Sequence, residues 1–81
     1  MKWIKLGREV KGTGESTTYY GENSKRFTIE SRKRLVPHAN GIGGWWFTSY
    51  WLIDNNEGTE KQYYRLADAK EAAEEKVNHE G

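Results

Sequence analysis

Few residues in this chain have the types and the spacing that catalysis or metal binding requires. The two histidines, His38 and His79, have no second histidine or cysteine at the spacing of zinc ligands, and the chain contains no cysteine. No serine lies in a Gly-x-Ser-x-Gly context that would make it a nucleophile. Residues 41–44 match the Gly-x-x-Gly pattern that clamps a nucleic-acid backbone between two helices, but here we expect a strand on either side. We therefore predict a protein that is not an enzyme and that needs no metal or cofactor.

The remaining residue types of interest are aromatic and cationic, and they point to binding. Residues 45–53 read WWFTSYWLI, so both alternating sets of side chains in this predicted strand include large rings. Successive side chains of a strand point to opposite faces of its sheet, and one buried face alone would need only one apolar set. We expect the odd-numbered set to fill the core: Trp45, Phe47, Trp51 and Ile53. The even set, with Trp46 and Tyr50, then needs either a covering element or a partner.

The outward face of this sheet is the first candidate binding site. With the odd set beneath the helix, Trp46 and Tyr50 would lie beside the arginines of the preceding strand, and bases stack on rings while phosphates pair with guanidinium groups. Two alternatives stay open. An arginine could lie over Trp46 in an internal cation–π contact of about 0.5–1 kcal/mol, or the tyrosines at 19–20 or the N-terminal strand could cover this face. The candidate site consists of seven residues: Arg32, Arg34, Trp46, Tyr50, Lys25, Arg26 and Lys33.

The second candidate surface is acidic. Residues 1–40 hold nine Lys and Arg against four Glu, a net charge of +5, whereas residues 41–81 hold four against eight Asp and Glu, a net charge of −4. Such a charge distribution favours different partners for the two halves of the chain, although it is also typical of ordinary solubilising charge. The acidic residues of the predicted helix would suit a basic partner, or would simply form its solvated face: Asp68, Glu71, Glu74 and Glu75.

The elements that must position these residues follow from periodicity and turn composition. Alternating or aromatic segments predict strands at about residues 3–10, 26–35, 45–54 and 60–65, and residues 17–20 have strand composition in a short run. From residue 66 to about 78 the apolar positions recur at helical spacing, and most of them are alanines. We predict an α+β fold: an antiparallel sheet of three to four strands with one C-terminal helix packed on one face.

Length and composition favour one small domain over residues 1–81. With no cysteine, the core has to come from large residues, and the chain offers four Trp, five Tyr and two Phe. No apolar run approaches the roughly 20 residues of a membrane helix, and the N-terminus lacks the apolar segment of a secretory signal. We expect a cytoplasmic protein without membrane association.

Three segments of the chain resemble a known pattern. They are KRFTI at residues 25–29, WLID at 51–54 and YRLADAKEAAE at 64–74. Together they are similar to small uncharacterised proteins of bacteriophages and prophages, in which a tryptophan strand precedes a helix that begins aromatic-x-x-Leu-x-Glu-Ala-Lys. The likeness covers roughly residues 19–75 and implies a shape and a mobile-element origin. Arg65 departs from it, since Ser or Thr is usual there as a helix cap, and so does the long insertion at 37–44. The element order also resembles the arm-binding domain of phage integrases, which reads DNA with its sheet.

We therefore expect a non-catalytic, phage-type binding protein of the host cytoplasm that acts through its aromatic and basic sheet face. The partner would be nucleic acid or a host protein, such as a nuclease or defence component, that the chain inhibits. The alternative is a homodimer formed through the same aromatic face, because contiguous apolar patches often mark interfaces.

Overall fold

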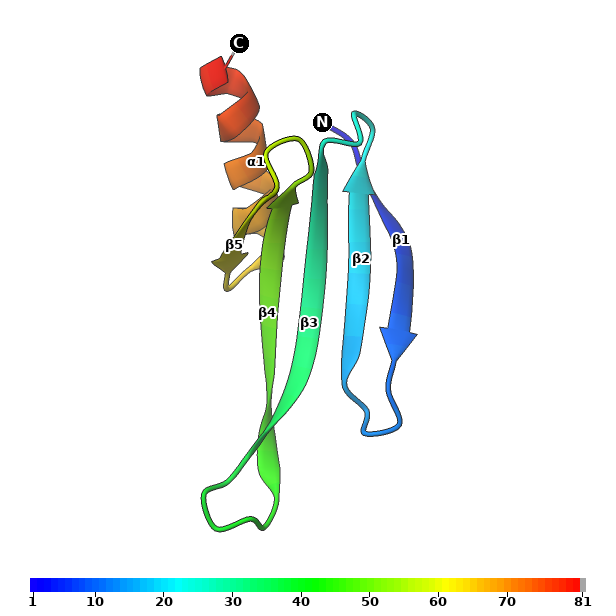
Figure 1. The fold of residues 1–81 in the computed structure, drawn as a ribbon, viewed down its shortest axis with the longest axis vertical. Coiled ribbons are helices and arrows are strands. Elements are labelled where there is room, and N and C mark those ends of the chain that lie inside the picture. The colour runs from blue at the N-terminus through cyan, green and yellow to red at the C-terminus, as the bar shows by residue number, and fades with distance from the viewer. Residues whose placement is uncertain (81) are drawn as a thin grey trace.

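A computed structural model describes residues 1–80 as an antiparallel sheet followed by one helix (Figure 1). The predicted α+β class is confirmed, but the sheet has five strands, in the order β1-β2-β3-β4-β5, and not three to four. The elements are β1 (Trp3–Val10), β2 (Ser16–Glu22), β3 (Phe27–Pro37), β4 (Gly44–Asp54), β5 (Thr59–Tyr63) and α1 (Leu66–Glu80).

The additional strand is β2, which sequence composition alone indicated only as a short run at residues 17–20. It pairs with β1 from Ser16 to Glu22 and with β3 from Ser16 to Gly21, so it lies inside the sheet. A β-bulge in β1 between Lys5 and Gly7 shifts the register of the first pairing. The strand extends through Gly21 and Glu22, which composition assigned to a turn, because Gly21 is paired on both edges and Glu22 is paired with Trp3 of β1.

The core lies between α1 and one face of the sheet. Phe27 and Ile29 of β3 and Leu52 of β4 are buried against Ala69 and Ala73 of the helix. The methyl side chains of the two alanines let the helix backbone approach the sheet closely, and the rings and branched side chains of the strands fill the remaining volume.

The assignment of β4 side chains to the two faces was wrong. Ile29 pairs with Leu52 and Ser31 pairs with Tyr50, and directly opposite residues share a face, so the even-numbered residues of β4 face the helix. The odd-numbered residues, including Trp51, lie on the opposite face of the sheet. The register of the β3–β4 hairpin determines which residues of β4 face the helix. Pro37 pairs with Gly44, which leaves residues 38–43 as the loop.

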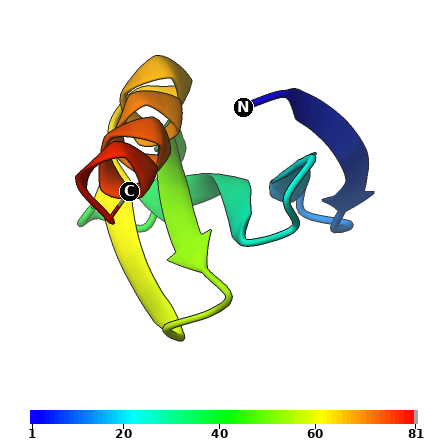
Figure 2. The same ribbon diagram turned by 90° about the horizontal axis from the view of Figure 1, so that it is seen from above.

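The molecule is elongated, 51 × 22 × 21 Å, because one hairpin extends beyond the rest of the sheet. The β3–β4 hairpin continues past the last residues that pair with β2 and β5, and its loop forms the lower end of Figure 1. We call residues 34–47 the arm. At the opposite end the sheet curls, so that α1 and the N-terminal part of β1 lie on the same side of it (Figure 2).

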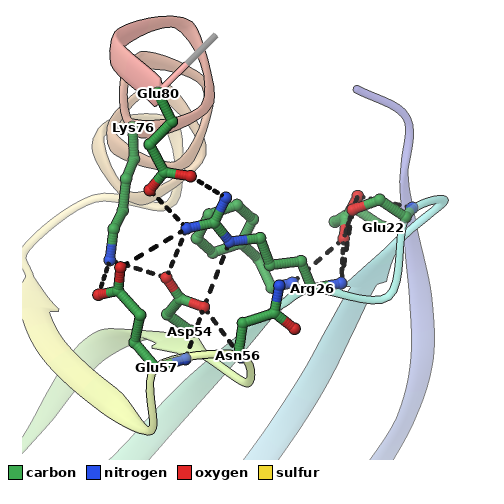
Figure 3. Close-up of polar contacts among 9 residues, drawn as sticks. Glu22, Arg26, Asp54, Asn56, Glu57, Lys76 and Glu80 are labelled. Atoms are coloured by element: carbon green, nitrogen blue, oxygen red, sulfur yellow. Dashed lines mark hydrogen bonds and ion pairs between the residues drawn. The ribbon is translucent and has the colours of Figure 1, made fainter.

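A cluster of charged residues fixes the C-terminal half of α1 to the sheet (Figure 3). Arg26, at the start of β3, contacts Asp54 at 3.1 Å and Glu80 of the helix at 2.5 Å. Lys76 of the helix lies 2.7 Å from both Asp54 and Glu57. The side chain of Asp54 is only 3% exposed, so its carboxylate is held almost entirely by these partners and by backbone amides.

The single helix of residues 1–80 is charged on much of its surface. Nothing in this part of the chain is both long enough and apolar enough, as a helix, to cross a lipid bilayer.

Candidate functional site: the aromatic arm

The arm exposes several large apolar side chains. Trp45 is 50% exposed, Trp46 is 45% exposed, and Leu35 and Ile42 are 40% and 76% exposed. Trp45 and Trp46 are neighbours in one strand, so their rings lie on opposite faces of the hairpin. The arm therefore presents an aromatic surface on both faces, which a chain of this size does not need for its own core.

On the helix side of the sheet, Trp46 lies beyond the part that α1 covers. The Nζ atom of Lys33 is 5.0 Å from the centroid of its ring. The ring also lies over the β1–β2 turn, where a side chain at Gly14 would come within 3.3 Å of it. Gly14 has φ +91°, a conformation that favours glycine, and the lack of a side chain there leaves room for the indole ring. Contact on one side holds the indole in place while almost half of it stays exposed.

On the opposite face three rings form a continuous row, which we call the aromatic cluster: Trp45, Phe47 and Tyr64. The Trp45 and Phe47 centroids are 5.8 Å apart with the rings nearly perpendicular, and those of Phe47 and Tyr64 are 6.4 Å apart at 70°. Edge-to-face geometry is the favoured arrangement for aromatic pairs. Tyr64 is 75% exposed, so the row is a surface feature.

The two arginines predicted to meet phosphates are engaged within the chain. Arg32 contacts Glu30 at 2.9 Å and Glu60 at 3.7 Å, and its guanidinium lies 4.7 Å from the ring centroid of Trp51. Arg34 donates hydrogen bonds to the backbone carbonyl of Ser16 at 2.7 Å and to the hydroxyl of Thr17 at 2.9 Å. The internal cation–π alternative thus describes Arg32, although its partner ring is Trp51 and not Trp46.

Tyr50 and Arg26 also belong to the body of the protein. Tyr50 is half-buried, packs against the core and lies opposite Tyr63 of β5. Arg26 belongs to the charged cluster, where the hydrogen bonds that it donates to Glu80 and Asp54 raise the pKa of its guanidinium above the ordinary value. Its partners leave little of this side chain available for a phosphate.

Lys25 lies in the β2–β3 turn, at the opposite end of the molecule from the arm (Figure 1). It has φ +62°, and the turn is held by the buried carboxylate of Glu22, which accepts hydrogen bonds from the amides of Ser24, Arg26 and Phe27. Burial alone would raise the pKa of Glu22, but these bonds and one from the Ser24 hydroxyl outweigh it and lower the pKa.

The seven predicted residues therefore do not form one surface. Trp46 and Lys33 lie together at the arm, Arg32 and Arg34 lie on the other face of the sheet, and the remaining three belong to the core, the charged cluster and the distant turn.

The acidic residues of the second candidate surface lie on α1. Glu71, Glu74 and Glu75 are exposed, and no ion pair in residues 1–80 involves them. Asp68, in the first turn, lies 3.9 Å from Arg65. Exposed acidic side chains of this kind are typical of a solvated helix face.

Most of the arm surface was not among the predicted site residues: Leu35, Ile42, Trp45 and Phe47 were missing, and so was Tyr64, which contacts the arm from the end of β5. The length of the two predicted strands at residues 26–35 and 45–54 was the available indication, because a hairpin longer than its neighbouring strands has to project from the sheet.

Comparison with known proteins gives no match to a family model, a curated protein or a solved structure. Within the described part of the chain, no three His, Asp or Glu side chains are grouped so that they could hold a metal ion. The function has to be inferred from the geometry of the arm.

Proposed function

We propose that this chain is a non-catalytic binding protein that docks a partner protein through the aromatic arm. The supporting observation is the exposure of Leu35, Ile42, Trp45 and Trp46 on a projection beyond the folded body. Exposed apolar patches of this kind are typical of interaction surfaces, and tryptophan is among the residues that contribute most to binding at interfaces.

A protein partner suits this surface better than nucleic acid. Nucleic-acid binding depends on cations that are free to neutralise phosphates. Arg32 is paired with two glutamates and Arg34 bonds to Ser16 and Thr17, so neither is free without breaking an internal contact. The rings of the arm need no such rearrangement to meet an apolar surface.

Binding of single-stranded nucleic acid is the second candidate, and one observation favours it. Residues 31–53 contain Arg32, Lys33 and Arg34 and no Asp or Glu, so the segment that includes the arm carries only positive charges. Bases stacked on Trp45 and Trp46 would gain about 1–3 kcal/mol each. A labelled oligothymidine titrated at two salt concentrations tests this candidate. Its affinity should fall with salt, with a log–log slope of about −0.7 for each phosphate neutralised. Salt-independent or undetectable binding at low ionic strength rejects it.

The likeness to phage proteins makes a host protein the partner to search for, and inhibition the expected consequence of binding. A homodimer built through the same rings is distinguished by sedimentation at two protein concentrations, because only self-association depends on the concentration of the chain itself.

Site-specific photo-crosslinking tests the proposal in cells. A benzophenone amino acid placed at Ile42, on the tip of the arm, should capture a defined protein, whereas the same group at Glu71, on the exposed helix face, should not. The captured protein is then purified, and Trp46→Ala should weaken its binding at least tenfold while Glu71→Ala leaves it unchanged. Equal capture at both positions, or equal binding by both variants, contradicts the proposal.

A further inference from the structure

The two edges of the β3–β4 hairpin differ in the protection of their backbone. β4 pairs with β3 along its whole length, but β5 pairs only with Tyr50–Asp54. Residues 44–49 of β4 therefore have one unpaired edge, which we call the open edge. Within residues 1–80, β3 alone pairs with this segment, and no element hydrogen-bonds to its backbone from the other side. Figure 1 shows β5 ending partway along β4 while the hairpin continues alone.

The corresponding edge of β3 is blocked. Past the end of its pairing with β2, the amide of Leu35 donates to the carboxylate of Glu15 at 3.2 Å. Arg34 lies across the same edge and bonds to the carbonyl of Ser16, and Pro37 has no amide hydrogen to offer. Charged side chains and proline are the usual devices that keep an edge strand from pairing with another chain.

The open edge has none of these devices. Its sequence is GWWFTS, with no charge and no proline, and it consists largely of residues with high strand propensity. The chain cannot cover it with β5, because Tyr64 and Arg65 lead directly into α1. An uncharged aromatic edge beside a protected one indicates a pairing site.

From this contrast we propose that the open edge binds an extended segment of the partner protein, which adds to the sheet as a sixth strand beside residues 45–49. This deepens the proposed function and rests on it. Main-chain hydrogen bonds would give the affinity, and pockets for alternate side chains the specificity. At about 3.3 Å per residue, a five-residue strand fills the edge.

The side chains around the edge define the chemistry of the segment. On one face its alternate residues would meet the aromatic cluster of Trp45, Phe47 and Tyr64, so they should be apolar. Two cations lie nearby: Lys33 is opposite Thr48, and Arg65, which follows Tyr64, is 82% exposed at its side chain with Asp68 at 3.9 Å. No acidic residue occurs from 31 to 53. The partner segment is therefore acidic and apolar in alternation.

A second copy of the chain fits this edge less well. Antiparallel pairing of two copies centred on Phe47 would place Gly44 of the second copy opposite Tyr50. Tyr63 of β5 already occupies that position. The loop at 38–43 of the second copy would then run into β5, whereas a single extended segment has no such obstruction.

The test uses the full chain and a defined probe, the blocked hexapeptide Glu-Val-Glu-Phe-Glu-Val. In two further versions, the backbone nitrogens of every second residue are methylated, at the odd positions in one peptide and at the even positions in the other. Because the amides of alternate residues point to the same edge of a strand, each version loses the hydrogen-bond donors of one edge only. We expect the unmodified peptide to bind and to slow amide exchange within residues 45–49. Methylation of one set should weaken binding at least tenfold, since each lost backbone hydrogen bond costs about three- to tenfold, while the other set changes it little. A version with Lys in place of Glu should bind more weakly.

Three results would overturn the inference. In the first, both methylated peptides bind equally well and amide exchange at residues 45–49 does not change. The arm then docks through side chains alone, so strand addition is rejected while the proposed function stands. Lack of binding by the unmodified peptide at about 1 mM rejects strand addition as well, and crosslinking at Ile42 still decides the proposed function separately. Concentration-dependent protection of residues 45–49 in the free chain would assign the edge to a second copy instead.

Discussion

Replacement of Asp54 by asparagine should lower the free energy of unfolding by about 2–3 kcal/mol. The carboxylate accepts from Arg26 Nη2 at 3.1 Å and Nε at 3.3 Å, from Lys76 at 2.7 Å, and from the amides of Asn56 at 3.0 Å and Glu57 at 3.3 Å. The side-chain oxygen of asparagine can still accept from the two backbone amides. Its NH2 group, however, is a donor and cannot accept hydrogen bonds from Arg26 and Lys76.

The expected loss of stability depends on which acidic partners Arg26 and Lys76 keep in the Asp54→Asn variant. A hydrogen bond to a charged group is worth about 1.5–3 kcal/mol, so loss of two such partners would remove about 3–6 kcal/mol. Arg26 keeps Glu80, and Lys76 keeps Glu57 at 2.7 Å, so neither charge is left alone and about half of the loss is recovered. For a chain of this length, with a total stability of about 4–12 kcal/mol, the substitution should lower the Tm by about 10–20 °C.

Urea unfolding followed by tryptophan fluorescence measures this change, with Glu57→Gln as the control. The side chain of Glu57 is 48% exposed, and its replacement should cost less than about 0.5 kcal/mol. A loss in Asp54→Asn no larger than in the control would show that the charged cluster does not hold the helix to the sheet.

The same carboxylate predicts a dependence on pH. Hydrogen bonds from Arg26, and then from Lys76 and the amides, hold the pKa of Asp54 well below its ordinary value near 3.8, against the opposing effect of burial. Below that ordinary value the unfolded chain binds more protons than the folded one, so stability must fall as the pH drops through this range. The contribution is fully present above about pH 5 and should be missing from Asp54→Asn. An unchanged acid slope in that variant would refute the assignment.

Two further predictions concern close packing. Ala69→Leu should destabilise the chain by about 1–3 kcal/mol, because Ala69 is fully buried against the sheet, while Ala67→Leu on the exposed side should change little in the same urea assay. Gly44→Ala should destabilise the base of the arm, since a β-carbon there would lie 2.7 Å from the carbonyl oxygen of Val36, whereas Gly12→Ala meets no atom within 4 Å. Amide exchange of the arm that is equally fast in the two glycine variants would contradict the second prediction.

The sequence predicts the elements of this fold better than the faces they present. The alanine stripe at helical spacing located α1, and alternation located β3, because both patterns are strong and local. β2 was underestimated because its identity as a strand comes from pairing on both sides and not from its own composition. Strand composition is a weak guide when neighbouring strands supply the stabilisation.

The face of β4 could not be read from composition, because both of its alternating sets contain rings. The outcome depends on the number of residues in the β3–β4 loop: a shift of register by one residue would turn every side chain of β4 to the other face. Because Trp51 lies on the face opposite the helix, Arg32 makes its cation–π contact with Trp51, and the contact with Trp46 is made by Lys33. The seven residues of the first candidate site are therefore divided between the two faces of the sheet, the core, the charged cluster and the distant turn.

Met1 and the C-terminal turn of α1 lie at one end of the molecule, while the hairpin loop lies at the other (Figure 1). A tag, a fluorescent protein or a surface tether joined at either terminus would thus stand some tens of ångströms from the aromatic tip. Immobilised by its termini, the chain would present that tip to the solution, so the proposed docking surface would stay accessible to a partner in sensors and affinity matrices made in this way.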